Sequence, residues 1–159
     1  MENLGNHVSH CLRYSCTYFL TLEIRKPFTK PFIITTWYRP PGLSGDKCLP
    51  NFEQYLIKLD LEEKESIILG DFNCDLLYNP FLLESYQYTQ FIDEATRVTQ
   101  SSKTLIDHIY SNTSHMINSS GVLHISISDY SLIYCVRKFP CFKSRNRGKT
   151  IKYRCFKKI

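Results

Sequence analysis

The chain lacks the sequence patterns that mark a zinc site, a redox motif or a membrane span. Its seven cysteines form no Cys-x-x-Cys pair, and none of them has a histidine at zinc-ligand spacing. No apolar run approaches the roughly eighteen residues that a transmembrane helix needs, and residues 17–22 are too short and too polar for a signal-peptide core. We therefore expect a soluble intracellular protein, nuclear or cytoplasmic, with reduced thiols and no membrane partner.

Acidic side chains are missing from residues 137–159, which contain ten of the twenty Lys and Arg residues. The rest of the chain carries the other ten and all fifteen Asp and Glu, so the body has a charge of about −5 and the tail +10. A basic tail with interleaved aromatic rings can follow a nucleic-acid backbone while its rings stack on bases. This reading makes Arg145, Arg147 and Lys149 candidate nucleic-acid contacts, and the alternative is a solvated basic linker.

The sequence does contain enough apolar material for one globular domain, since 43% of its 159 residues are hydrophobic and 14% are aromatic. Residues 32–38 are rich in β-branched and aromatic side chains and end at Arg39-Pro40, which predicts a strand that runs into a loop. Apolar residues recur at helical spacing over residues 51–59, and residues 66–69 predict the next strand. This succession indicates one half of a layered α/β or α+β fold.

Weaker patterns fill the rest of the chain. A loop is expected to lead to a short helix at residues 90–94, and two further strands are predicted at 105–110 and 131–136. Three apolar side chains of the last strand share one face: Leu132, Tyr134 and Val136. Residues 22–25 alternate as in a strand, which places Glu23 on the solvent side.

The most informative stretch is residues 67–73, in which three apolar residues end abruptly at Gly70 and two oxygen-bearing side chains. Alternation along an extended backbone puts Asp71 and Asn73 on one side and turns Phe72 into the core. Carboxylate and amide oxygens are ligands that Mg²⁺ accepts. A buried strand that stops at such a pair predicts a catalytic edge.

Further polar groups lie at the edges of the predicted strands. Asp107 is placed inside an otherwise apolar strand, where a carboxylate is costly unless a partner or a metal ion satisfies it. Asp129 comes just before the last strand, and Tyr38 and Arg39 put a phenol and a guanidinium at the end of the first. An Asp near a strand end is most often a turn residue, so the conjunction of these groups, rather than any one of them, predicts an active site.

Four stretches in this order and spacing give the chain a resemblance to a known family. The chain resembles the endonuclease/exonuclease/phosphatase superfamily, which has the DNase I-like four-layer α/β/β/α sandwich, and in particular the endonuclease of non-LTR retrotransposons. The resemblance spans about residues 20–138. The matching stretches are WYRPP at 37–41, ILGDFN at 68–73, TLIDHI at 104–109 and ISDY at 127–130.

The resemblance implies a role for each matched residue. Asp71 and Asn73 would contact the scissile phosphate and the attacking water, Asp129 would help to hold a divalent cation, and Tyr38 would lie beside the phosphate. Asp107 would orient the catalytic histidine of the family. The implied cofactor is Mg²⁺ or Mn²⁺, with Asp71, Asn73 and Asp129 as ligands, and the implied substrate is DNA, with Arg39 as a further contact.

Two departures from the family pattern predict weak or absent catalysis. Tyr130 stands where the family has the histidine of a Ser-Asp-His motif. A phenol, with a pKa of about 10, cannot replace an imidazole as a base, and losing such a group typically costs roughly 10²–10⁴-fold in rate. His108 neighbours Asp107 on a strand and so points to the other face, which favours a structural role. The N-terminal half of the domain, with its Asn and metal-binding Glu, is expected to be missing.

We therefore expect a DNase I-like α/β (α+β) fold, C-terminal portion only. Residues 1–19 are unassigned, 20–138 form the partial domain, and 139–159 form a basic tail similar to the connector toward the polymerase in such elements. The expected function is a Mg²⁺-dependent DNA endonuclease of retrotransposon origin, impaired in catalysis and without its reverse transcriptase domain. Two alternatives stay open: a non-catalytic nucleic-acid-binding or functionless remnant, and a phosphatase of the same superfamily.

Overall fold

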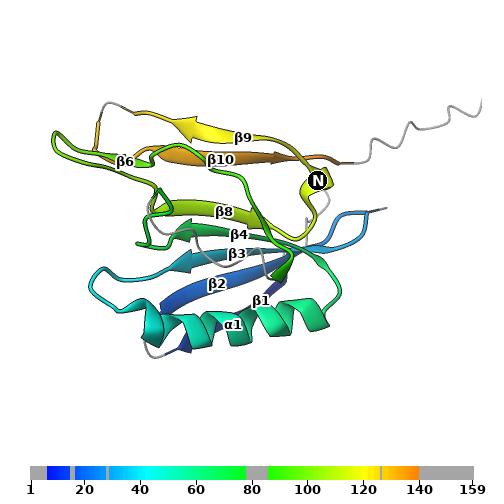
Figure 1. Cartoon of the computed structure of the whole chain (residues 1–159). Coiled ribbons are helices and arrows are strands. Elements are labelled where there is room, and N and C mark those ends of the chain that lie inside the picture. Colours follow the sequence, from blue (N-terminus) through cyan, green and yellow to red (C-terminus); the bar gives the residue numbers. More distant parts are fainter. Residues whose placement is uncertain (1–6, 15–16, 28, 78–85, 126, 140–159) are drawn as a thin grey trace, which may run out of the picture.

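A mixed six-stranded sheet forms the centre of the molecule (Figure 1) in a computed structural model that describes residues 7–14, 17–27, 29–77, 86–125 and 127–139. The strand order is β1-β2-β3-β4-β8-β5, in which β3 and β4 run parallel and every other neighbouring pair is antiparallel. Its strands are β1 (His7–Tyr14), β2 (Thr17–Ile24), β3 (Phe32–Tyr38), β4 (Glu65–Asp71), β5 (Thr89–Gln90) and β8 (Asp107–Ser111). The predicted strands at 32–38, 66–69 and 105–110 correspond to β3, β4 and β8.

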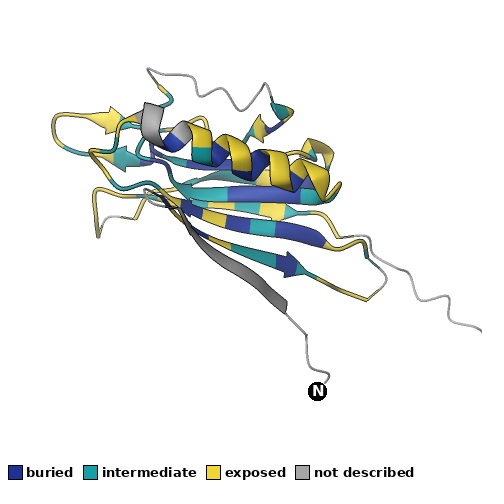
Figure 2. Ribbon diagram, turned by 90° about the horizontal axis from the view of Figure 1, so that it is seen from below, coloured by how far each residue is buried: buried dark blue, intermediate teal, exposed yellow. Residues whose placement is uncertain are grey.

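Helix α1 (Gly45–Leu61) joins the two parallel strands and completes the predicted unit of strand, helix and strand. Its four apolar residues at helical spacing are almost fully buried, as predicted: Phe52, Tyr55, Leu56 and Leu59. Figure 2 shows buried and exposed residues alternating along the helix. The helix begins before residue 51 and runs through Pro50, whose missing N–H removes one intrahelical hydrogen bond. No helix in the described part of the chain has the length and apolar character needed to cross a membrane.

An aromatic core lies between α1 and the sheet, and Trp37 is central to it. The Trp37 ring stacks on Phe19 at 5.3 Å and on Phe72 at 6.4 Å between ring centroids, and it meets Phe52 edge-on at 4.4 Å. Phe72 thus points into the core, as predicted. Gly70 has a φ of +144°, and a Cβ there would lie 1.9 Å from the Trp37 carbonyl oxygen, so the packing of β4 on β3 requires a glycine.

A hairpin covers the face of the sheet opposite α1. It consists of β9 (Ile117–Leu123), which follows the short 3₁₀ helix η2 (Ser114–Met116), and β10 (Leu132–Arg137), the strand predicted at 131–136. A second cluster of buried apolar residues joins the hairpin to β4 and β8: Ile67, Ile92, Leu105, Ile109 and Ile117. The predicted face of β10 exists, but it points outward, and its side chains are exposed: Leu132, Tyr134 and Val136.

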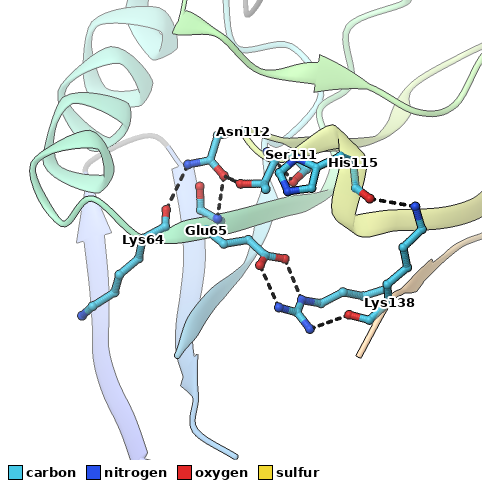
Figure 3. Close-up of polar contacts among 9 residues, drawn as sticks. Lys64, Glu65, Ser111, Asn112, His115 and Lys138 are labelled. Atoms are coloured by element: carbon cyan, nitrogen blue, oxygen red, sulfur yellow. Dashed lines mark hydrogen bonds and ion pairs between the residues drawn. The ribbon is translucent and has the colours of Figure 1, made fainter. Parts of the chain in front are cut away.

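An ion pair between Arg137 and Glu65 links the end of this hairpin to the start of β4. Arg137 donates two hydrogen bonds to the Glu65 carboxylate, of 2.6 and 2.7 Å, and the two side chains are only 8% and 14% exposed. The guanidinium also lies 4.1 Å from the Phe32 ring centroid and 4.7 Å from that of Phe139. Figure 3 shows the Glu65 carboxylate in this contact, with Lys138 beside it. Charge as well as apolar packing therefore holds the hairpin on the sheet.

The helix predicted at residues 90–94 is wrong. Residues Thr89–Gln90 form β5, which pairs with β8, and an irregular segment follows. The Gln90 side chain accepts a hydrogen bond from the Ile92 N–H and donates one to the Ile92 carbonyl. Such local side-chain bonds satisfy the backbone without a helix.

The solvent-side placement of Glu23 is also wrong. Alternation along β2 is correct, but the face that carries Glu23 is the buried one, because α1 packs on it: Phe19 and Thr21 of this face contact Tyr55 of the helix. Glu23 pairs there with Arg25 at 2.8 Å and with Lys64 at 3.3 Å. The strand predicted at residues 22–25 is the end of β2, whereas β1 and the first part of β2 were not recognisable in the first twenty-one residues, where alternation is weak.

Candidate active site

Three predicted site residues stand in one row at an edge of the sheet. Tyr38 ends β3, Asp71 ends β4 and Asp107 begins β8, and the register pairs Tyr38 with Asp71 and Asp71 with Asp107. Residues paired across neighbouring strands point to the same face, here the face opposite α1. The fold therefore brings a phenol and two carboxylates together from three separate parts of the chain.

Asn73 joins this row through a turn and not by strand alternation. Its φ of +46° is left-handed, so the backbone is no longer extended and the predicted alternation of Asp71 and Asn73 is wrong. The Asp71 carboxylate accepts the Asn73 N–H at 2.9 Å, and the Asn73 side-chain amide donates to the Arg39 carbonyl at 2.7 Å. Arg39 in turn donates to the carbonyls of Leu43 and Phe72, both at 2.6 Å, and of Asn73. The Arg39 guanidinium thus holds the loop that positions Asn73.

Asp107 is incompletely hydrogen-bonded. Its backbone N–H donates to the Thr96 hydroxyl at 3.0 Å, and Thr96 also bonds its carboxyl group. The Oδ2 atom is buried, however, and no described residue pairs with it. Burial and the nearby charge of Asp71 raise the pKa of Asp107 above its ordinary value. A buried carboxylate oxygen without a hydrogen-bond partner is destabilising, so this atom marks a polar position that the described residues leave unsatisfied.

Asp129 approaches the site from the loop before β10, and an arginine pairs with it. Arg97 lies in β6 (Arg97–Val98), which pairs with β7 (Lys103–Thr104), and it donates its Nε–H to the Asp129 carboxylate at 2.9 Å. This hydrogen bond holds the pKa of Asp129 below its ordinary value. The guanidinium lies 5.1 Å from the centre of the Tyr130 ring, and the two backbones form a β-bridge.

His108 is structural, as predicted. It is fully buried on the opposite face, and its ring stacks on Phe72 at 4.7 Å. Its Nε2 faces the carbonyls of Cys74 at 3.0 Å and Leu105 at 3.1 Å, so this nitrogen carries the proton, and Nδ1 accepts the Tyr110 hydroxyl at 3.0 Å. Burial lowers the pKa of His108 to about 4, which keeps the ring neutral at physiological pH.

A pocket of about 660 Å³ opens beside Asp129. Polar groups from two loops and β7 line it, among them Lys103, His124 and Ser131. His124 Nδ1 and the Ser131 hydroxyl are 2.8 Å apart. Pockets of 300–1,000 Å³ typically hold small ligands, so a nucleotide-sized group has room next to Asp129.

Sequence reasoning missed Thr96 and Arg97, which complete the surroundings of Asp107 and Asp129. Their segment shows no helical or strand period, and the β-branched neighbours on either side of Arg97 are its only strand signal. The predicted nucleic-acid contacts Arg145, Arg147 and Lys149 lie outside the described residues, with the rest of the tail.

The described side chains that could ligate a metal ion do not form a preformed site for a divalent cation. The Oδ2 atom of Asp129 is taken by Arg97, and one oxygen of Asp71 is taken by the N–H of Asn73. Among residues 7–139, as far as they are described, no three His, Cys, Asp or Glu side chains are grouped so that they could hold a metal ion. The residues present therefore do not fit, as they stand, the Mg²⁺ or Mn²⁺ that the resemblance implies.

Comparison with known proteins gives structural relatives only, because no protein-family model and no curated protein sequence matches the chain. The structure is similar to the endonuclease domain of TRAS1, a telomere-specific non-LTR retrotransposon, with a TM-score of 0.64 and 13% identity over 77% of this chain and 64% of that one. It is also similar to an endonuclease/exonuclease/phosphatase family protein from Leptotrichia buccalis C-1013-b, with a TM-score of 0.57 and 19% identity over 76% and 53%.

A third similar structure is a functionally unknown conserved protein from Enterococcus faecalis V583, with a TM-score of 0.56 and 15% identity over 76% of this chain and 56% of that one. The chain thus spans between about half and two thirds of the length of these structures. At such identities the similarity concerns the fold. The chain has the DNase I-like α/β fold of these structural neighbours.

Proposed function

We propose that this chain is an endonuclease-type domain of retrotransposon origin that binds DNA and is impaired in phosphodiester cleavage. The observation that carries the proposal is the row of Tyr38, Asp71 and Asp107 at one sheet edge, next to an arginine that interacts with both Asp71 and Asp129. The similarity of the fold to the TRAS1 endonuclease domain supports it. A phenol and several carboxylates at one edge are suited to position a phosphodiester and a water molecule.

Each residue of the row has a simple polar role in the proposed site. The Tyr38 phenol donates a hydrogen bond to a phosphate oxygen, and the Asp71 carboxylate accepts one from the attacking water. Asn73 keeps Asp71 in place through its backbone N–H. Burial raises the pKa of Asp71, which makes its carboxylate a better proton acceptor than an exposed one.

Tyr130 accounts for the proposed impairment. Its ring faces the Arg97 guanidinium, and the Oδ2 atom of Asp107 has no described partner. Without an imidazole, the proton that leaves the attacking water has no strong acceptor oriented by Asp107. We expect catalysis to be weaker by roughly 10²–10⁴-fold than with a histidine at this position.

The test is nicking of a supercoiled plasmid by the full chain with Mg²⁺ or Mn²⁺, the cations that the resemblance implies. Tyr130→His should raise the nicking rate, and Asp71→Asn in the same chain should abolish that gain. Tyr134→His is the matched control, because it adds an imidazole on the exposed outer face of the same hairpin. A folded Tyr130→His chain that nicks no faster than Tyr134→His would show that Tyr130 is not the cause.

A non-catalytic nucleic-acid-binding remnant is the second candidate, and the unpaired Oδ2 of Asp107 favours it. Binding should then come from the basic tail and fall steeply with salt. The deletion to test is 140–159, because a cut at residue 137 would also remove the ion pair with Glu65. Salt-dependent binding that survives Asp71→Ala but is lost with the tail would support the remnant over the endonuclease.

A phosphatase of the same superfamily is the remaining candidate, since the pocket beside Asp129 has room for a small phosphate ester. Hydrolysis of phosphomonoesters by the same preparation, with no nicking of plasmid DNA by either wild type or Tyr130→His, would favour it.

We place the domain at residues 20–138 and the basic tail at 139–159, and strands β1 and β2 extend the regular structure back to residue 7.

A further inference from the structure

Among the described residues, Arg97 is a cationic side chain in direct contact with Asp129, one of the predicted metal ligands. Its Nε donates to Asp129 Oδ2 at 2.9 Å, while the Ser128 hydroxyl donates a long hydrogen bond of 3.4 Å to the other oxygen of Asp129. The contact is anchored in the backbone, because Arg97 forms a β-bridge with Tyr130, the residue after Asp129. The Val98 N–H also donates to the Asp129 carbonyl at 2.8 Å. The short β6 strand therefore fixes Arg97 next to Asp129.

The Arg97 charge also reaches the sheet edge. Asp71 and Asp129 both raise the pKa of Arg97, and Arg97 in turn lowers that of Asp71, although burial has the larger and opposite effect there. The guanidinium keeps its charge at every pH at which a protein is folded. The guanidinium therefore places a permanent positive charge beside these carboxylates, as a bound divalent cation would.

We propose that Arg97 is the built-in counter-cation of Asp129 and competes with divalent metal ions for that carboxylate. The inference rests on the proposed function and on the metal-ligand role that the resemblance implies for Asp129. An oxygen that accepts the Arg97 N–H must lose that bond before it can coordinate an ion, and the guanidinium repels the ion. The side chains of Arg97 and Asp129 are 42% and 39% exposed, so the ion pair itself is weak and the competition is reversible.

Binding of Mn²⁺ to the full chain, followed by the electron paramagnetic resonance of the free ion and without DNA, tests this proposal. Arg97→Gln should tighten Mn²⁺ binding by roughly tenfold, from loss of an exposed ion pair together with loss of charge repulsion. Adding Asp129→Asn to that variant should abolish the gain. Arg25→Gln is the matched control, because it removes the same charge from an exposed arginine that pairs with a carboxylate at the opposite end of the sheet. Equal affinities for Arg97→Gln and Arg25→Gln would overturn the proposal.

A second measurement leaves Arg97 untouched and so does not depend on whether its variants fold. In the chain with Arg97 intact, Asp129→Asn should change Mn²⁺ affinity by less than about twofold, since the carboxylate is already engaged. A tenfold weakening would show that Asp129 binds the ion despite Arg97, and it would overturn the proposal. Failure of the proposed function is distinct from either result: it would appear as absence of nicking in every variant, including an Arg97→Gln chain that binds Mn²⁺ tightly.

Discussion

The ion pair between Arg137 and Glu65 gives the sharpest test of the packing. Replacing Arg137 by Ala should lower the free energy of unfolding by about 3–5 kcal/mol, because it leaves a carboxylate buried without its partner. The geometry of the Arg137–Glu65 pair supports a cost of this size. Both hydrogen bonds are short, at 2.6 and 2.7 Å, the side chains are 8% and 14% exposed, and the guanidinium also packs on Phe32.

A double-mutant cycle of Arg137→Ala and Glu65→Ala separates the pair from the packing. Unfolding in urea, read from the fluorescence of the single Trp37, should give a coupling energy of about 1.5 kcal/mol or more. The comparison cycle is Arg97→Ala and Asp129→Ala, a pair of similar length, 2.9 Å, but about 40% exposed, for which about 0.2–1 kcal/mol is expected.

Two results would refute the reasoning. Equal coupling energies in the two cycles would mean that burial adds nothing to the Arg137 pair. A cost below about 1 kcal/mol for Arg137→Ala, with an unchanged dependence on urea, would mean that the hairpin is held by its apolar contacts alone.

Three further predictions concern the stability of the fold. Gly70→Ala should abolish cooperative unfolding in urea or cost more than about 4 kcal/mol, whereas Gly42→Ala, at φ +85° with open space around it, should cost about 1–2 kcal/mol. Because burial lowers the pKa of His108 from 6.5 to about 4, the unfolded chain holds a proton there that the folded chain does not between these pH values. The free energy of unfolding should therefore fall by roughly 3 kcal/mol as the pH drops from 6.5 to 4, and urea curves of His108→Gln should lack this slope. Tyr55→Phe should cost roughly 1–3 kcal/mol in the same assay, because it removes the hydroxyl that bonds the buried Thr35.

The parts of the fold that could be predicted have local signals. β3 and α1 show their periods within a few residues, so both were recognisable, although Pro50 hid the start of the helix. β9 was not, because its sequence INSSGVL is polar and becomes a strand through pairing with β10 and packing on the sheet. Such non-local contacts leave no period in the sequence.

The candidate site divides in the same way. Tyr38 and Asp71 were predicted at strand ends and Asp107 inside a strand, and the register of the sheet places the three side by side. Arg97 could not be predicted, because its partner Asp129 lies 32 residues further along the chain and only the fold brings them together. The turn at Asn73 was missed because alternation assumes an extended backbone, and a left-handed residue ends it.

The hairpin of β9 and β10 lies near both ends of β4. Glu65 at the start of β4 forms an ion pair with Arg137 at the end of the hairpin. Asp71 at the other end of β4 interacts electrostatically with Arg97, the partner of Asp129 in the hairpin loop. The Arg137 ion pair therefore helps to hold, from the other end of the sheet, the hairpin whose loop carries Asp129. A substitution at residue 137 would weaken the attachment of this hairpin while leaving every predicted site residue unchanged. The sequence motifs of the candidate site therefore do not report on the contact that keeps the hairpin on the sheet.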